Sequence, residues 1–438
     1  NKSGVATIDF ESDGTGTSGL GITTLASQDV QVTGAVYRLA QIGVAPNPIT
    51  LNARVGDMAS AVIDISNTAA NDGYSEDLKV TGRTDSGDVA SSGMIGGLIA
   101  AGATDSNISV ALNTVSSGAK SGSVAFTAVS DGTQTSGFLT DAAIPGATVN
   151  VLGNVWQTAV ADVQPTVDFG IVHVGDSVAD MGVGVSNTAS GALVDVVRGG
   201  ITSTTGSAFS GGGNLGAGVA TGGSDSSNLL IALDTSSAGT FSGTANVDLT
   251  SHNDDLADVS LGTTTVNLSA QVNAYANPIF QFVAGDGSLG GAGNNFVLDF
   301  GSIAVGTMGS WDAELAIRNA VTVPADDVDG LFDLTGVDDY LASGFVGFMD
   351  LTAGDSVSGL LLSLDTSLLA AGLYSDTLVL LAEGHNASGY RGSLAPITLT
   401  IRGQVFQPGV NVPVPATLLL LLVGPVLIRA AGSRRVRG

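Results

Sequence analysis

The feature that most limits how this chain can fold is an internal repeat. Three stretches open alike, each with a Val-Gly pair followed by an alternating strand pattern that ends in Asn: residues 51–69, 167–189 and 298–320. Two further patterns follow in the same order, and Leu112, Leu233 and Leu364 hold equivalent places in the three copies. The period is therefore about 120–130 residues, which is the size of a domain and several times longer than a solenoid repeat. The sequence predicts tandem copies of one fold.

The local pattern within each copy is that of β-strands. Residues 244–250 alternate polar and apolar side chains, and residues 229–233 form a short apolar run of the kind found in buried strands. Short strands separated by Gly, Asn, Asp and Ser favour an antiparallel β-sandwich. The 62 glycines and a charged fraction of only 12% make a helical protein improbable on composition. We therefore predict an all-β chain of tandem immunoglobulin-like β-sandwich domains.

Prolines mark the expected joints between the copies. They stand at Pro46, Pro48, Pro165, Pro278 and Pro408, where proline stiffens a linker without interrupting a central strand. The predicted β-sandwich repeats are residues 46–163, 164–277 and 278–408.

Residues 1–45 resemble only the last third of a copy. Residues 1–19 match residues 119–137, and residues 32–38 match residues 151–157. We therefore predict the C-terminal part of an incomplete β-sandwich repeat at residues 1–45. Three explanations stay open: a chain that lacks the preceding residues, strands that pair with a neighbouring molecule by β-strand addition, or a segment that folds onto the next domain.

Charge and the lack of cysteine exclude several classes of function. The formal net charge of −26 disfavours nucleic acid and anionic lipid headgroups as partners, because both repel an acidic surface. With no cysteine there can be no disulfide framework, thiolate metal site or cysteine nucleophile. No nucleic-acid partner is expected.

Catalytic signatures are missing from the sequence. The three histidines, His173, His252 and His385, lie far apart along the chain, and no two have the spacing of metal ligands. His173 is expected on a strand surface, and the other two in polar turns. No nucleophile elbow or phosphate-binding loop is present. We predict no catalytic residues, no cofactor-binding residues and no enzymatic activity, with a polysaccharide-acting enzyme as a remote alternative.

One acidic stretch offers oxygen ligands for a cation. Asp327, Asp329 and Asp333 stand with Gly330 in a segment expected to be a loop, although the twelfth-position Glu of a calcium loop is missing. We predict a weak structural calcium site at these three residues. Solvated acidic turns are the alternative.

Residues 409–438 differ in character from the rest of the chain. The apolar run from Ala416 to Ile428 would form a helix of about 20 Å, shorter than the ~30 Å hydrocarbon core of a membrane. Four arginines follow this run. Because positively charged flanking residues stay on the cytoplasmic side of a membrane, the acidic body is expected on the exported side. We predict a short C-terminal hydrophobic helix that associates transiently with a membrane; a stop-transfer anchor and an accidental apolar end are the alternatives.

This C-terminal segment resembles a PEP-CTERM sorting signal. The resemblance rests on a Pro-x-Pro motif, the apolar run and the terminal arginines, with Val414 in the place where Glu is usual: Val412, Pro413, Val414, Pro415, Arg429, Arg434, Arg435 and Arg437. It implies recognition by an exosortase in the inner membrane of a Gram-negative bacterium. It also implies a final location at the cell surface or in the extracellular matrix of a biofilm, with exopolysaccharide as a candidate partner.

The repeats are similar to choice-of-anchor D domains, which are immunoglobulin-like modules of bacterial surface proteins. The matching residues are Asp168-Phe169-Gly170 with Val174-Gly175, and Asp299-Phe300-Gly301 with Val305-Gly306. In the first repeat, Leu51-Asn52-Ala53 stands in place of Asp-Phe-Gly.

Together these features predict an exported, non-enzymatic structural and adhesive protein of the cell surface or extracellular matrix. The alternative is a self-assembling filament or sheath subunit that pairs by β-strand addition, for which a second copy of the chain would be the partner.

Overall fold

The computed structural model describes residues 1–409, which contain β-strands, turns and loops but no helix. The all-β prediction is confirmed for this part of the chain. The predicted C-terminal helix and every predicted sorting residue, from Val412 to Arg437, lie outside the described residues. Within residues 1–409, no helix has the length and apolar character needed to cross a membrane.

By its internal contacts the chain divides into two units. The first comprises residues 1–169, 177–234 and 241–270, and the second comprises residues 170–176, 235–240 and, among the described residues, 271–409. Three hydrophobic cores are present, drawn from residues 40–155, 159–270 and 276–405. Each core draws mainly on one predicted repeat, but each also includes a residue just before that repeat's predicted start: Ala40, Ala159 and Ala276. The domain limits stay predictions.

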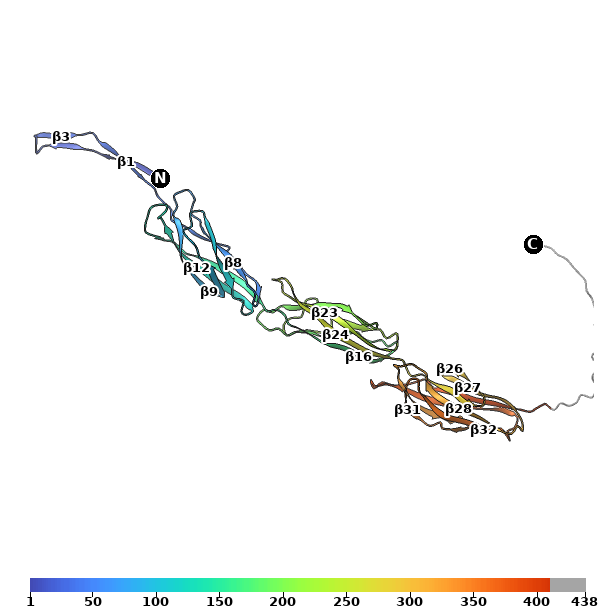
Figure 1. The fold of residues 1–438 in the computed structure, drawn as a ribbon. Coiled ribbons are helices and arrows are strands. Elements are labelled where there is room, and N and C mark those ends of the chain that lie inside the picture. The colour runs from blue at the N-terminus through green and yellow to red at the C-terminus, as the bar shows by residue number, and fades with distance from the viewer. Residues whose placement is uncertain (410–438) are drawn as a thin grey trace, which may run out of the picture. The chain divides into compact units, whose positions relative to one another are not determined.

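The third repeat, in the second unit, is a sandwich of two sheets (Figure 1). One sheet has the order β25 (Pro278–Gly285), β28 (Ser310–Asn319), β32 (Ser356–Asp365) and β30 (Leu341–Ser343). The other has the order β26 (Ser288–Ala292), β27 (Asn295–Ala304), β35 (Ile397–Phe406), β33 (Gly372–His385), β29 (Asp327–Asp333) and β31 (Phe348–Leu351), with β34 (Arg391–Ser393) beside β33. The first sheet occupies the A-B-E-D places of an immunoglobulin sandwich, and β29, β33 and β35 occupy its C, F and G places. The immunoglobulin-like prediction is confirmed here by strand order.

The first repeat, in the first unit, has the same plan. One sheet runs β5 (Ile42–Ala45), β8 (Ser60–Asn67), β11 (Thr104–Leu112) and β10 (Val89–Gly93). The facing sheet runs β13 (Ala142–Ala143), β12 (Gly118–Asp131) and β14 (Ala147–Trp156), with β9 (Asp77–Gly87) on β12, and with β6 (Ile49–Thr50) and β7 (Ala53–Arg54) parallel to β14.

The second repeat has one continuous sheet and one divided face. The continuous sheet is β16 (Thr166–His173), β24 (Val259–Asn273), β23 (Gly239–His252) and β19 (Val196–Thr204), and the last residues of β16 and β24 belong to the second unit. The divided face consists of β15 (Ala161–Val163), β18 (Val185–Asn187) and β21 (Ser224–Asp225), followed by β17 (Met181–Gly182), β22 (Leu230–Leu233) and β20 (Phe209–Gly212).

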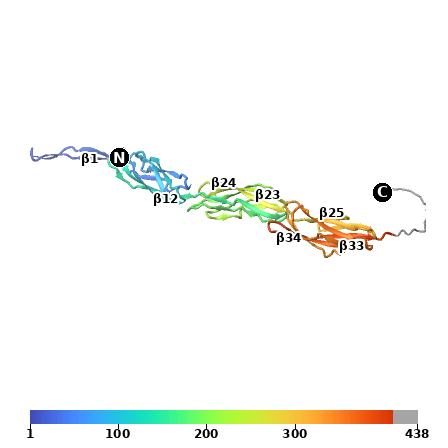
Figure 2. The same ribbon diagram turned by 60° about the horizontal axis from the view of Figure 1, so that its bottom comes forward.

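Strand alternation decides which side chains form each core. In β33, which Figure 2 shows with β25 of the other sheet, Leu378 and Leu380 are buried while Leu381 is exposed. Successive strand residues point to opposite faces, so one face of β33 lines the core and the other faces outward. Side chains on the outward face do not pack in the core, so they are available to bind a ligand or a partner.

Each repeat also has a buried asparagine as the last residue of one strand: β8, β18 or β28. The Asn319 amide donates to the carbonyls of Asp326 (3.0 Å) and Leu351 (3.2 Å), and its Oδ1 accepts from the Asn277 amide at 2.9 Å. Asn67 and Asn187 bond the equivalent backbone groups of their own repeats. Because buried backbone carbonyls need partners, this side chain ties two loops to the core.

Residues 1–34 form a two-part hairpin: β1 (Lys2–Ile8) pairs with β4 (Gln28–Gly34), and β2 (Glu11–Gly14) pairs with β3 (Leu20–Thr24). The pairing of Ala6 with Val30 repeats the pairing of Val124 with Val149 in the first repeat. Val124 and Val149 are fully buried, whereas Val30 is 43% exposed. The hairpin therefore has the register of β12 and β14 but leaves its core-facing side uncovered.

Candidate functional site

The candidate site lies on the outward face of the third repeat, where β29, β31 and β33 run side by side. The acidic stretch expected to be a calcium loop is the strand β29, so the loop prediction was wrong. Asp327, Asp329 and Asp333 alternate with the buried Val328 and Phe332, and their carboxylates are spread along the strand. Asp333 accepts the amide of Thr335 and takes no part in the cluster described next. Calcium binding itself stays a prediction.

Asp350 reaches this face because β31 contains an extra residue. Val328 pairs with Leu351 and Gly330 pairs with Phe348, so β31 has three steps where β29 has two. Such a bulge re-aims side chains next to it. Among the described residues, Asp350 is the one non-glycine with a positive φ, 54°. The short polar side chain of aspartate tolerates that conformation.

Gly330 is needed for the same arrangement. A Cβ atom at Gly330 would lie 2.2 Å from the Phe348 ring, far inside contact distance. The bare backbone of Gly330 therefore lets the ring lie against β29, which fixes the start of β31.

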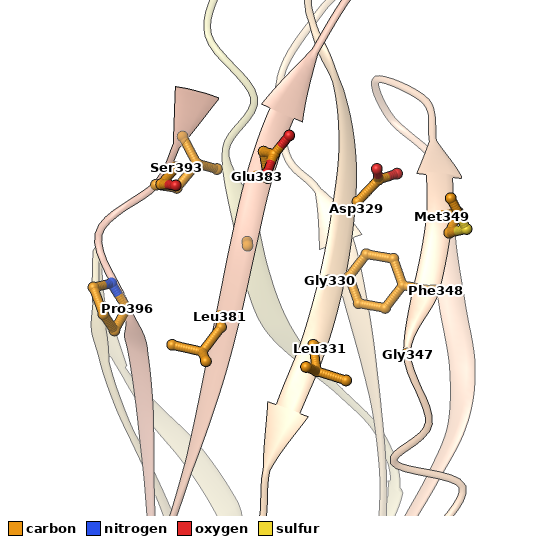
Figure 3. A pocket seen from close by; sticks show the side chains of 12 residues that line it. Asp329, Gly330, Leu331, Gly347, Phe348, Met349, Leu381, Glu383, Ser393 and Pro396 are labelled. Carbon is orange, nitrogen blue, oxygen red and sulfur yellow. The ribbon is translucent and has the colours of Figure 1, made fainter. Parts of the chain in front are cut away.

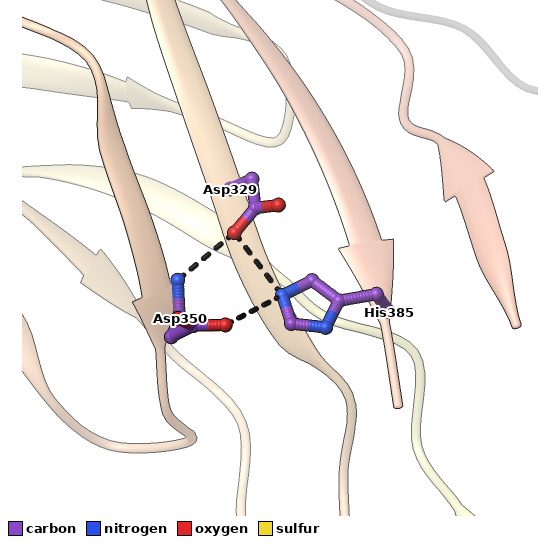
Figure 4. Close-up of side chains that lie close together, drawn as sticks. All are labelled: Asp329, Asp350 and His385. Carbon is purple, nitrogen blue, oxygen red and sulfur yellow. Dashed lines mark hydrogen bonds and ion pairs between the residues drawn. The ribbon is translucent and has the colours of Figure 1, made fainter. Parts of the chain in front are cut away.

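Asp329, Asp350 and His385 converge at one point (Figure 4). His385 Nε2 lies 3.1 Å from Asp329 Oδ1 and 3.4 Å from Asp350 Oδ1. The Asp350 amide donates to Asp329 Oδ1 at 2.9 Å. The imidazole and Asp329 side chains are 13% and 17% exposed, whereas the Asp350 side chain is 75% exposed. The cluster is thus held by two inner groups and open to solvent on one side.

Charges around the cluster are mostly negative. Burial alone would raise the pKa of Asp329, but hydrogen bonds from the Asp350 amide, Arg391 and His385 lower it below its ordinary value. Burial raises the pKa of Asp327, and although His385 opposes this, the neighbouring carboxylates add to it. Arg391 Nη1 also bonds Glu383 at 2.8 Å. Arg391 therefore pairs with two carboxylates, Asp329 and Glu383. Among the described residues, no ion pair with lysine or arginine is formed by Asp327 or Asp350.

A groove of about 800 Å³ adjoins the cluster (Figure 3). Its walls are the apolar side chains of Leu331, Phe348, Met349, Leu381 and Pro396, and Asp329 and Glu383 stand at one end. Leu331 and Met349 are 61% and 73% exposed. Apolar walls with acids at one end fit an apolar or cationic ligand better than an anionic one.

A second set of buried polar contacts lies at the Val-Gly turns. Arg54, directly before Val55-Gly56, donates its Nε to the Asp195 carboxylate at 2.8 Å, and the Asp195 side chain is fully buried. Ser251 Oγ and Asn253 Nδ2 also donate to Asp195, both at 2.7 Å. This contact, within the first unit, joins the first repeat to the second.

His173 occupies the equivalent place in the second repeat, before Val174-Gly175, and belongs to the second unit. Its Nε2 lies 2.8 Å from Asp326 Oδ2, and the ring stacks on Tyr275 with centroids 4.3 Å apart. Expected on a strand surface, His173 is instead 5% exposed. In the third repeat the same place is taken by Ala304. We call Arg54 and His173 the joint residues, and Asp195 and Asp326 the joint carboxylates.

No protein-family model and no curated protein matches the chain. Among solved structures it is similar to titin domains I67–I69, with 10% identity, 85% of this chain and 100% of that chain covered, and a TM-score of 0.29. It is similar to the Escherichia coli adhesin FdeC, with 15% identity, coverage of 84% and 99%, and a TM-score of 0.24. It is also similar to mouse protocadherin-24 EC1-3, with 12% identity, coverage of 82% and 98%, and a TM-score of 0.33. Similarities at this level assign neither a family nor a function.

Proposed function

We propose that this chain is an exported, non-enzymatic structural and adhesive protein of the cell surface or extracellular matrix. The observation that carries the proposal is that Arg54 and His173, at equivalent places in their repeats, each contact a buried joint carboxylate. A buried charge left without its partner is costly, so each pairing resists separation of the parts it joins. A chain of sandwiches with such joints suits a spacer that presents an acidic, Ser- and Thr-rich surface. Exopolysaccharide is the partner we propose for that surface.

The C-terminal segment would deliver this protein. We propose that it is a PEP-CTERM-type signal, recognised by an exosortase during transient association with the inner membrane of a Gram-negative bacterium. The support is its sequence: a Pro-x-Pro motif, a short apolar run and terminal arginines.

Changing both Pro413 and Pro415 to alanine should block removal of this segment. The rigid Pro-x-Pro motif would present the chain to the processing enzyme, and alanine would leave it flexible. Mass spectrometry of protein recovered from cells should give a chain that ends near the motif for the native sequence, and a chain that ends at Gly438 in the membrane fraction for the variant. Pro165→Ala is the matched control and should be processed normally. Native protein recovered with Gly438 still attached would refute the sorting proposal.

The uncovered hairpin favours a second candidate, self-assembly by β-strand addition. The side that should face a core carries Ile8 (45% exposed), Phe10 (41%) and Val32 (55%). Apolar side chains on an open two-stranded hairpin are a surface on which strands of another molecule can pair.

If that candidate holds, Ile8→Asp should abolish assembly, since a charge would then occupy the apolar side. Sedimentation velocity and electron microscopy at high protein concentration would measure the loss. Val5→Asp is the control: Val5 is 53% exposed but pairs with Gln31 and points to the opposite side of the hairpin. Native protein that stays monomeric at high concentration would rule out this candidate.

A further inference from the structure

One ring nitrogen of His385 lies near two carboxylate oxygens at once. Two carboxylate oxygens, from Asp329 and Asp350, approach the same ring nitrogen at 3.1 and 3.4 Å. A single Nε2 proton points in one direction and can serve only one of them well. A positive centre among the three atoms would satisfy both oxygens and the nitrogen together.

The spacing of these atoms fits a small metal ion. Zinc ligands lie at about 2.0–2.2 Å for both nitrogen and oxygen, which puts neighbouring ligand atoms of a tetrahedral site roughly 3.3–3.5 Å apart. The distances from His385 Nε2 are close to that range, and all three ligand atoms lie within 4.8 Å of one another. The Asp350 side chain is 75% exposed, so it has room to adjust toward the other two ligands.

We propose that Asp329, Asp350 and His385 bind one divalent transition-metal ion of the zinc class. The three ligands come from β29, from β31 and from the end of β33, so the ion would tie together three strands of one sheet. Binding uses the Nε2 lone pair of the neutral imidazole, whose one ring proton is then on Nδ1. The neighbouring negative charge of Glu383 and Asp327 favours a cation at this place.

The ligand set distinguishes this site from the calcium site expected from the sequence. Calcium takes six to eight oxygen ligands, whereas an imidazole nitrogen with carboxylates is typical of zinc and its neighbours. Of the three aspartates expected to bind calcium, only Asp329 belongs to the cluster.

His252 provides a matched control within the same chain. It also lies near two carboxylates, but Asp258 approaches Nδ1 at 2.6 Å while Asp254 approaches Nε2 at 3.5 Å. Because the two acids face opposite ring nitrogens, no single ion can contact all three groups.

The test is isothermal titration of zinc chloride into the metal-stripped full chain, purified without a polyhistidine tag. We expect one zinc ion bound per chain at this site, with affinity reduced at least tenfold, the order of magnitude that even outer-shell changes cost, in His385→Gln and in Asp350→Asn. His252→Gln should bind as the native chain does. Calcium at the same concentration should neither bind there nor displace zinc.

A second readout is the thermal midpoint of the third repeat, followed by the fluorescence of Trp311. Zinc should raise it in the native chain and in His252→Gln, because an ion that binds only the folded state stabilises that state, and should leave His385→Gln unchanged. Variants whose metal-free midpoint equals that of the native chain are folded and therefore informative. Equal zinc affinity in native and His385→Gln protein, or displacement of zinc by calcium, would overturn the proposal.

Discussion

Replacing Asn319 by alanine should lower the free energy of unfolding of the third repeat by about 3–5 kcal/mol, because two buried carbonyls and one partly buried amide lose their partner at once. Asn319 is completely buried. Its side chain satisfies the carbonyls of Asp326 and Leu351 and the amide of Asn277, and alanine offers none of these bonds. Each buried polar group left without a partner costs about 1–3 kcal/mol, so the sum exceeds that of an ordinary substitution.

Urea unfolding followed by Trp311 fluorescence would measure this loss. Trp311 belongs to the third core and the other tryptophan, Trp156, to the first repeat, so the signal can be assigned by a Trp156→Phe background. Asn294→Ala is the control: Asn294 also donates to two carbonyls, of Ala395 and Pro396, but is exposed, so water replaces what is lost. A similar small effect at both positions would contradict the structural role assigned to Asn319.

Arg54→Ala should destabilise the first unit by about 3 kcal/mol, the lower end of the cost of breaking a buried ion pair. The carboxylate of Asp195 has no exposed surface and would keep only the hydrogen bonds from Ser251 and Asn253. The lower end is expected because Arg54 Nη2 makes no hydrogen bond, so the native pair is not fully satisfied.

Thermal and urea unfolding, followed by Trp156 fluorescence, would report this change, since Trp156 Nε1 bonds Asp255 of the second repeat at 2.9 Å. Arg38→Ala, which breaks an exposed pair with Asp72, should cost no more than about 1 kcal/mol. Changing Arg54 to Met together with Asp195 to Leu should recover only part of the loss: no buried charge is then left alone, but Ser251 and Asn253 lose their acceptor. Equal effects at Arg54 and Arg38 would show that the joint contact contributes little.

Much of the fold could be predicted from the sequence because the same signals recur in each copy. The alternating strands and the asparagine that ends each opening pattern have the same physical cause in every repeat: one sheet face is buried, and one side chain satisfies the loops beneath it. The place of residues 1–34 also followed from repetition, since their register is that of β12 and β14.

The candidate site could not be predicted in the same way. Asp329, Asp350 and His385 come together through the pairing of β29 with β33, and through one extra residue in β31. Neither leaves a local signal in the sequence. The acid-rich composition of β29 suggested a loop, although its alternating Val328, Gly330 and Phe332 are what a strand requires.

His173 was misplaced for another physical reason. The comparison with Ala304 suggested a tolerant surface position. What covers this residue is Tyr275, which follows the last strand of the second repeat, together with Asp326 and Tyr390 of the third repeat. The sequence pattern of one repeat does not indicate which of its residues are buried by the neighbouring repeat.

Ala304 gives the series a fixed order. Arg54 and His173 each contact a carboxylate of the next sandwich, and the third sandwich has Ala304 in the equivalent place. The order of the modules therefore matters. If the third module were moved to the middle, the carboxylate of the module after it would have no basic side chain as its partner. If the third module were followed by a further copy, a basic residue at position 304 would be needed to form the same contact with the carboxylate of that copy.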